Sequence, residues 1–355
     1  MADRPAKKKF HVKKLGCRLM RTQACTRKFA YVANSLSNDV SAFEIDRLTG
    51  ALTELSPPVS TGARPNAVAV HPSGKFVYVT GLDSDDISVY RVDSKTGALI
   101  RVGSPVPTES EPACMAFDPS GRFAYVACIH DGHLASYAVA VATGALTLVD
   151  EPLLCEGAPF SIALHPSGKF LYLANVDSRD VTSYRIDPTS GALTALWPPT
   201  PTGGSPRAIA IHPNGRFAYV TSSESHAISV YRIDPGLGRL DAVGGSVQVE
   251  TFVFGVVIEP RGQFAFATSP TSNHVSAFAI DGATGALRTV GAPLRAGTHP
   301  RAIVIEPDGR FAYVANCASH DISIYGIDRS TGALTSAGAP VAVGRLPVSI
   351  AIQTV

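Results

Sequence analysis

The chain has 355 residues, of which 45% are hydrophobic and only 17% charged, so it can bury a large core. Its net charge of +2 hides an asymmetry: residues 1–28 hold ten Lys/Arg and one acid, which leaves 21 Lys/Arg and 28 acids for residues 29–355. This mildly acidic body argues against a nucleic-acid partner, because a nucleic-acid groove needs a basic face.

Residues 1–28 are basic, polar and without hydrophobic periodicity. They lack the apolar run of about 7–15 residues that a secretory signal needs, and no segment of the chain is long enough to span a membrane. We expect a disordered tail in a cytoplasmic protein. A nucleic-acid or membrane-surface arm is the alternative for the tail, and export stays open if this N-terminus has replaced a signal.

The cysteines are few and show neither a C-x-x-C pair nor the spacing of a metal site. We therefore expect mostly buried thiols in a reducing compartment. The six cysteines are at positions 17, 25, 114, 128, 155 and 317.

The strongest feature of the sequence is an internal repeat of 47 residues. The hexapeptide "FAYVAN" at 29–34 recurs in related form at this constant spacing. A glycine register, mostly in "TGAL", and a proline register with Val253 as its one exception have the same period. The hexapeptides begin at 29, 76, 123, 170, 217, 264 and 311.

One repeat unit contains four short segments with the alternation and β-branched or aromatic residues of strands. They are "NAVAVHP" (66–72), "FVYVTG" (76–81), "ISVYRVD" (87–93) and "ALIRV" (98–102). We find no helical pattern within 29–355. Seven four-stranded units of this length predict an all-β, seven-bladed β-propeller over residues 29–355.

The two ends of the repeat predict how the ring closes. The repeat opens at its second strand, in "KFAYVAN" (28–34), and the chain ends on a lone first strand, "PVSIAIQTV" (347–355). Pairing of these two segments completes the seventh blade.

The pattern P-x-x-x-A/V-x-H-P-x-G-K/R-F-x-Y-V-x-N … I-S-V-Y-x-I-D … T-G-A-L resembles the lactonase family of seven-bladed propellers. This family includes bacterial 6-phosphogluconolactonases, fungal carboxymuconate-lactonising enzymes and the related YVTN-repeat propellers. The resemblance covers 29–355 and implies the fold more strongly than the activity. The histidines of the H-P turns are interpreted as turn residues on the face away from the family's site: His71, His165 and His212.

The resemblance also implies a site at the channel mouth, where first strands begin and second strands end. The family's motifs "C-H-S", "G-P-R-H", "N-E" and "Q-P-R-G" correspond here to "APFS" (158–161), "SPRA" (205–208), "TSSE" (221–224) and "HPRA" (299–302). Arg207 and Arg301 match the family's two arginines. Phe160 and Ala208 replace the histidines, Ser223 stands at the glutamate position, and Glu224 follows one residue late.

Two arginines can bind a carboxylate or phosphate with paired hydrogen bonds. Opening a lactone also requires a base or acid within hydrogen-bond reach, and the family's candidates are absent. His299, Glu224 and His226 are possible replacements, or else solvated loop side chains.

No cofactor and no metal are expected. His130 and His133 lie near Cys128 and Asp131, but a loop pair without further ligands binds a metal weakly. "FVFG" (252–255) breaks the proline register and brings two aromatic residues to the mouth, as an apolar wall or as simple variation.

Two functions remain open. The first is a lactone hydrolase that acts on a small anionic lactone of the sugar-acid type, with Arg207 and Arg301 as substrate-binding residues and His299 or Glu224 as the base. The second is a non-catalytic propeller that binds a protein, a glycan or a small anion through its rim loops. A monomer is expected, because ring closure removes most free strand edges.

Overall fold

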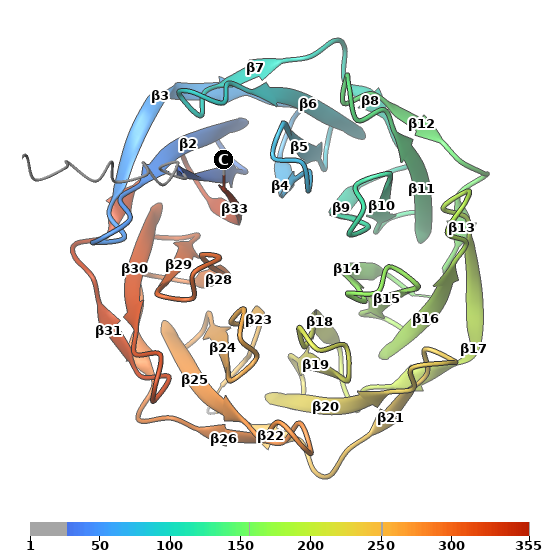
Figure 1. Cartoon of the computed structure of the whole chain (residues 1–355), viewed down its shortest axis with the longest axis vertical. Coiled ribbons are helices and arrows are strands. Elements are labelled where there is room, and N and C mark those ends of the chain that lie inside the picture. Colours follow the sequence, from blue (N-terminus) through green and yellow to red (C-terminus); the bar gives the residue numbers. More distant parts are fainter. Residues whose placement is uncertain (1–26, 156, 250, 355) are drawn as a thin grey trace, which may run out of the picture.

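The computed structural model describes residues 27–155, 157–249 and 251–354. These residues form seven β-sheets arranged as blades around one axis (Figure 1), as the repeat predicts. They contain no helix, and therefore no helix of membrane-spanning length. Residues 1–26 of the predicted tail lie outside the described residues, and β1 begins at Lys28.

Neighbouring strands in each blade are antiparallel. They follow one another from the innermost strand beside the axis to the outermost strand at the edge of the ring. Blades 1 to 7 are numbered by their innermost strands: β4 (Pro65–Val70), β9 (Pro112–Phe117), β14 (Pro159–Leu164), β18 (Pro206–Ile211), β23 (Val256–Ile258), β28 (Pro300–Ile305) and β33 (Pro347–Thr354). The second strands are β5 (Phe76–Gly81), β10 (Phe123–Cys128), β15 (Phe170–Asn175), β19 (Phe217–Ser222), β24 (Phe264–Ser269), β29 (Phe311–Asn316) and β1 (Lys28–Asn34). The third strands are β6 (Asp86–Val92), β11 (His133–Val139), β16 (Asp180–Ile186), β20 (Ala227–Ile233), β25 (His274–Ile280), β30 (Asp321–Ile327) and β2 (Asp39–Ile45).

The outer strand differs from the prediction of one strand per blade. It is continuous in blades 3 and 7, as β17 (Leu193–Pro201) and β3 (Leu52–Ser60). In the other blades a bend divides it into two short strands. These pairs are β7 (Leu99–Arg101) and β8 (Val106–Pro107), β12 (Leu146–Leu148) and β13 (Leu153–Leu154), β21 (Leu240–Ala242) and β22 (Val247–Gln248), β26 (Leu287–Thr289) and β27 (Leu294–Arg295), and β31 (Leu334–Ser336) and β32 (Val341–Ala342).

The hexapeptide register forms the second strands, which are buried almost throughout because a neighbouring blade covers each face. Each of these strands contacts the "TGAL" glycine of the next blade. The Tyr78 hydroxyl donates to the Gly144 carbonyl (2.8 Å), and a Cβ on Gly144 would lie 2.6 Å from the Phe76 ring. Gly144 has φ 77°, a conformation that glycine adopts without strain.

The histidines of the H-P turns make a second contact between blades. His71, His165 and His212 hydrogen-bond through Nε2 to the carbonyls of Gly121, Gly215 and Gly262 in the following blade, at 2.7, 2.9 and 2.8 Å. Their rings are therefore held in structural contacts at the turns between first and second strands.

The ring closes as the two chain ends predict. β33 pairs antiparallel with β1 over its whole length, for example Tyr31 opposite Ala351. At the start of β1 the buried Lys28 ammonium lies between the carboxylates of Glu306 and Asp308 in blade 6. The closing blade is thus held by a strand pair and by a buried ion pair.

The four cysteines in the described ranges are free thiols. Cys128, Cys155 and Cys317 are buried and Cys114 is partly buried, in agreement with the expectation of mostly buried thiols. Cys17 and Cys25 lie outside the described residues.

Ending the chain at Arg345 should abolish cooperative unfolding near the temperature of the full-length protein. The deletion removes β33 with its buried Val348 and Ile350, and burial of one large aliphatic side chain contributes about 1.5–3 kcal/mol. Thermal unfolding followed by circular dichroism measures this. A shortened chain that melts cooperatively at the full-length temperature would show that the strand pair is not the closing contact.

Candidate functional site

One residue of each blade directly follows the position of the repeated proline, at or just before the start of the innermost strand. We call these seven residues the mouth ring: Asn66, Ala113, Phe160, Arg207, Phe254, Arg301 and Val348. In the pairing of β18 with β19, Pro206 is opposite Ser222 and Ala208 is opposite Thr221, so Arg207 is the extra residue of a bulge. Arg301 has the same place in blade 6. Bulges redirect side chains and are common beside functional sites.

Blades 3 to 6 place phenylalanine and arginine alternately in the mouth ring. The Arg207 guanidinium lies 5.5 Å from the Phe160 ring centroid, and that of Arg301 lies 5.1 Å from the Phe254 ring centroid. The Phe160 and Phe254 rings meet edge to face, with centroids 5.7 Å apart. Because these two blades are not adjacent, the side chains must extend toward the axis and converge there.

Arg301 is linked across blade 7 to a residue of blade 1. Its Nη2 donates to Oδ1 of Asn66 in blade 1 (3.2 Å), and Nδ2 of Asn66 donates to the Ala113 carbonyl (2.6 Å). Burial is the main cause that lowers the pKa of Arg301, and the positive charges of Arg207 and Arg64 lower it further. The charge of Arg207 is therefore close enough to disfavour the charged form of Arg301.

Arg207 is also desolvated, and burial lowers its pKa, while the more distant charges of Asp177 and Glu224 raise it. Its Nε donates to the Ser223 hydroxyl at 3.2 Å. Among the residues that the structure describes, neither Arg207 nor Arg301 forms an ion pair. The mouth ring thus carries two positive charges without a bound carboxylate.

Backbone contacts between blades hold the mouth ring in place. The Thr221 hydroxyl donates to the Phe254 carbonyl (2.7 Å), and the Thr268 hydroxyl donates to the Arg301 carbonyl (3.1 Å). Gly255 allows this close approach, because a Cβ there would lie 2.8 Å from the Arg301 carbonyl oxygen.

Glu224, a candidate base from the sequence, lies in the hairpin between β19 and β20, which also contains Ser223. Its Oε1 accepts hydrogen bonds from the Ser205 hydroxyl (2.8 Å) and from Nη2 of Arg179 (3.1 Å). The carboxylate is about half exposed. It is oriented by two donors and remains accessible to water.

His299, the other candidate base, directly precedes Pro300 and is exposed. Its backbone amide donates to Oδ1 of Asn273 (2.7 Å), and its φ is 59°. His226 lies in the same hairpin as Glu224, is exposed, and has φ 51°. No hydrogen bond of either imidazole to another described residue orients it toward the mouth ring.

The sequence had placed Arg207, Arg301 and Phe160 at the mouth and had noted aromatic residues in 252–255. It had not identified Asn66 as a partner of Arg301. The 47-residue register contained the signal, since every mouth-ring residue follows the repeated proline position.

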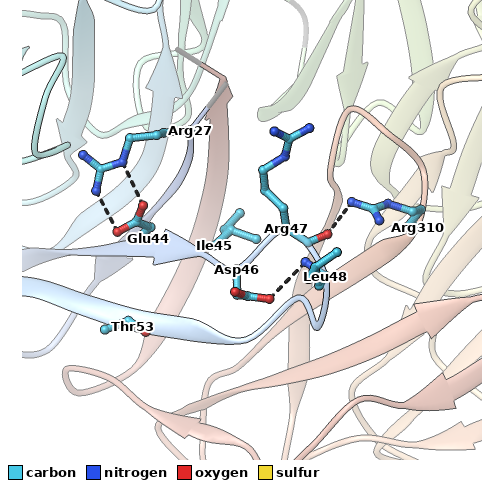
Figure 2. Close-up of a pocket in the computed structure, with 8 residues that line it drawn as sticks. All are labelled: Arg27, Glu44, Ile45, Asp46, Arg47, Leu48, Thr53 and Arg310. Carbon is cyan, nitrogen blue, oxygen red and sulfur yellow. Dashed lines mark hydrogen bonds and ion pairs between the residues drawn. The ribbon is translucent and has the colours of Figure 1, made fainter. Parts of the chain in front are cut away.

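A hollow of about 660 Å³ lies on the outer side of blade 7 (Figure 2). Its charges are matched locally: Arg27 pairs with Glu44 (2.7 Å), and Arg310 donates to the Arg47 carbonyl. Because it borders the turn at Asp46 and the Arg310 turn, it lies on the face away from the mouth ring.

Within the described ranges, no group of three metal-ligating side chains lies at the mouth ring.

Comparisons with known proteins place the chain in a family. No curated protein sequence matches it. Among solved structures it is similar to a Bacteroides uniformis protein assigned as a 6-phosphogluconolactonase (TM-score 0.83, 21% identity, 93% of this chain and 99% of that one). It is also similar to a Bacteroides fragilis protein with the same assignment (0.81, 23%, 92% and 98%) and to the periplasmic gluconolactonase PpgL of Pseudomonas aeruginosa (0.81, 23%, 93% and 99%).

At these identities the solved structures show the fold alone. The sequence model of the family described as "Lactonase, 7-bladed beta-propeller" matches residues 12–159, 106–199, 157–256 and 200–351. The chain therefore belongs to the lactonase family of seven-bladed β-propellers.

Proposed function

We propose that the protein hydrolyses a small anionic lactone at the mouth ring, with Arg207 and Arg301 binding the acid group of the substrate. One observation carries this proposal: two partly buried guanidinium groups, each with its pKa lowered by burial, lie near each other there without an ion-pair partner among the described residues. Burying a cation without a counter-charge is unfavourable, so the site favours an anion that can supply that charge. Carboxylates and phosphates match the planar donors of arginine.

The aromatic residues define the rest of the ligand. Phe160 and Phe254 stand between the two arginines and offer apolar faces, and Phe252 stacks on Phe254 with centroids 6.2 Å apart. A compact ring with an apolar face and an acidic substituent fits such walls. A sugar-acid lactone has both features.

In the hydrolysis, water adds to the lactone carbonyl carbon while a base takes one of its protons. The ring C–O bond then breaks, and the departing alkoxide takes the proton to give a hydroxy acid. The arginine charges would stabilise the oxyanion that forms at the carbonyl. Glu224 is the better candidate base, because Ser205 and Arg179 orient its carboxylate and its charge acts on Arg207. His299 is the second candidate.

The second candidate function is a non-catalytic propeller that binds a small anion at the mouth ring, or a protein or glycan through its rim loops. One observation favours it: no titratable side chain in the described ranges forms a hydrogen bond or ion pair with Arg207 or Arg301. Cytoplasmic location and a monomeric state remain predictions from the sequence, and the similar PpgL is a periplasmic protein.

Inorganic phosphate should stabilise the wild-type protein more than the double variant Arg207→Met/Arg301→Met. At a phosphate concentration one hundred times the Kd, binding adds about 2.7 kcal/mol to the free energy of unfolding, which a thermal-shift titration measures. Arg216→Met is the matched control, since Arg216 lies 5.4 Å from the Phe217 ring centroid in a turn on the opposite face. Equal shifts in all three proteins would mean that phosphate acts only as a general stabilising salt.

Wild-type protein should hydrolyse fresh 6-phosphogluconolactone, or an unphosphorylated lactone of a small panel, faster than a protein-free blank. The double variant Arg207→Met/Arg301→Met should fall to the blank rate, because it lacks the charges that bind the acid group. Acid release measured with a pH indicator follows the reaction. A phosphate-dependent thermal shift without any hydrolysis above the blank would favour the non-catalytic function.

Glu224→Gln should lower kcat by about 10²–10⁴-fold, the usual contribution of a general base. It should keep the phosphate-dependent thermal shift, because both arginines remain. Asp83→Asn is the control, since Asp83 occupies the same repeat position in blade 1 and pairs with an exposed arginine, Arg64 (2.9 Å). An unchanged kcat for Glu224→Gln would move the assignment of the base to His299.

A further inference from the structure

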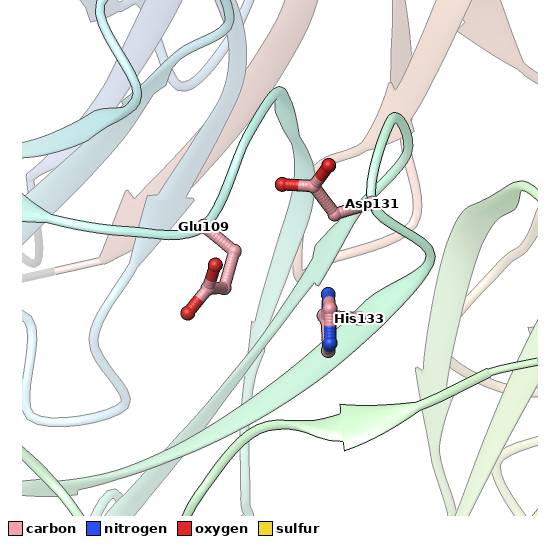
Figure 3. A group of neighbouring side chains, drawn as sticks. All are labelled: Glu109, Asp131 and His133. Atoms are coloured by element: carbon pink, nitrogen blue, oxygen red, sulfur yellow. The ribbon is translucent and has the colours of Figure 1, made fainter.

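Blade 2 carries a group of three metal-ligating side chains on its rim, apart from the mouth ring. Glu109 lies in the loop between β8 and β9, and Asp131 and His133 belong to the hairpin between β10 and β11 (Figure 3). One potential ligand atom from each side chain lies within 4.8 Å of the other two. The group faces the same end of the propeller as the mouth ring, because the hairpin corresponds to the one that carries Glu224.

The other blades show what these three positions do in an ordinary repeat. In blade 1 they are Gly62, Ser84 and Asp86, and a Cβ on Gly62 would lie 2.2 Å from Ser84 Oγ and 2.4 Å from Asp86 Oδ1. The three positions therefore touch one another as a consequence of the fold. Because a Cβ at the Gly62 position would clash with both side chains, Glu109 in blade 2 requires a local arrangement that differs from that of blade 1.

In the sequence, blade 2 is the one blade that has Asp, Glu or His at all three positions. Asp131 is the only non-serine at its position, and the other six blades have Ser37, Ser84, Ser178, Ser225, Ser272 and Ser319. Four blades have glycine at the position of Glu109, namely Gly62, Gly203, Gly297 and Gly344. Glutamate also stands at this position in blades 3 and 5, as Glu156 and Glu250, so Asp131 is the acid that distinguishes blade 2.

His133 adds an imidazole nitrogen to the two carboxylates of the group. At this position in blades 3 and 6, Asp180 and Asp321 accept hydrogen bonds from Asn175 and Asn316 (2.7 and 2.6 Å). Blade 2 has Cys128 in place of that asparagine, and Nδ1 of His133 is buried without a hydrogen-bond partner in the described part of the chain. Blades 1 and 5 also lack that asparagine, and Oδ1 of Asp86 and Nδ1 of His274 are likewise buried without a partner among the described residues. Within the described ranges, only in blade 2 does this unsatisfied atom belong to a group with two further metal-ligating side chains.

We propose that Glu109, Asp131 and His133 bind a divalent transition-metal cation of the Zn²⁺ or Mn²⁺ type. An imidazole nitrogen together with two carboxylates suits such ions better than Ca²⁺, which takes oxygen ligands. Metal–ligand bonds of about 2.0–2.2 Å need only small side-chain rotations from the observed spacing. The cation would join the loop before β9 to the β10–β11 hairpin and would keep at least one position open to water.

From the sequence no metal is expected, because His130 and His133, near Cys128 and Asp131, are a loop pair without further ligands. Of these four residues only His133 and Asp131 belong to the group, and Glu109 supplies the third ligand. Burial, with added repulsion from neighbouring negative charges that include Glu109 and Asp131, raises the pKa of Cys128 to about 12. Cys128 is not a member of the group of ligating side chains that lie within reach of one another.

The test uses variants that restore the residues of ordinary blades. Asp131→Ser keeps the local fold, because Asp131 accepts from the Ser110 amide (3.2 Å) just as Ser319 Oγ accepts from the Thr298 amide (3.0 Å). Glu109→Gly and His133→Ala have the precedents of Gly62 and of Ala227. Glu111→Gln is the matched control, a carboxylate on the same loop outside the group.

Full-length wild type and Glu111→Gln should bind one Mn²⁺, followed by electron paramagnetic resonance of the free ion, and one Zn²⁺, followed by competition with a chelator. Each of the three ligand variants should bind at least about tenfold more weakly, as expected for loss of one of three ligands. Their melting temperatures without metal should equal that of the wild type. Cysteines that bind Zn²⁺ elsewhere are common to all these proteins and cancel in the comparison. Equal affinities of wild type and Asp131→Ser for both ions would overturn the proposal.

Discussion

The fold depends on one contact that every blade makes with the next, in which a phenylalanine and usually a tyrosine of the second strand meet a turn glycine. The Tyr313 hydroxyl donates to the Gly50 carbonyl (2.9 Å) even across the ring closure, and a Cβ on Gly50 would lie 2.5 Å from the Phe311 ring. Because the glycine has φ 73° and no space for a side chain, the spacing of neighbouring blades is fixed. The phenylalanine and the glycine of this contact both recur every 47 residues, so the contact appears in the sequence as the repeat period.

The same constraint explains where functional differences can arise. The shared contacts occupy the turns at one end of the blades, so the loops and bulges at the other end are free to vary. The bulge places a mouth-ring residue at the axis in blades with very different side chains, from Ala113 to Arg301. The blades therefore differ at the mouth ring and at the blade 2 group mainly in side-chain identity on a similar backbone.

Much of the fold was predictable, because period, strand alternation and ring closure are local or repeated signals. The positions of Arg207 and Arg301 were predictable as well. The contact of Arg301 with Asn66 and that of Phe160 with Phe254 were not, since they join blades that are neither adjacent in sequence nor adjacent in the ring. Glu109, the third member of the blade 2 group, was missed for another reason: its loop and the hairpin are separated in sequence and meet only when the strands of the blade pair.

The treatment of buried cations within this one chain supports the reading of the mouth ring as an anion site. At the closing blade, the buried Lys28 has the carboxylates of Glu306 and Asp308 beside it, so the fold supplies counter-charges where a cation serves structure alone. The guanidinium groups of Arg207 and Arg301 are partly buried and lie near each other without such a partner in the described ranges. This arrangement is destabilising for the free protein, and the Thr221 and Thr268 hydrogen bonds to the ring backbone keep it in place. A site held in this way is preorganised, because a bound anion gains two charge-assisted contacts without rearrangement of the backbone.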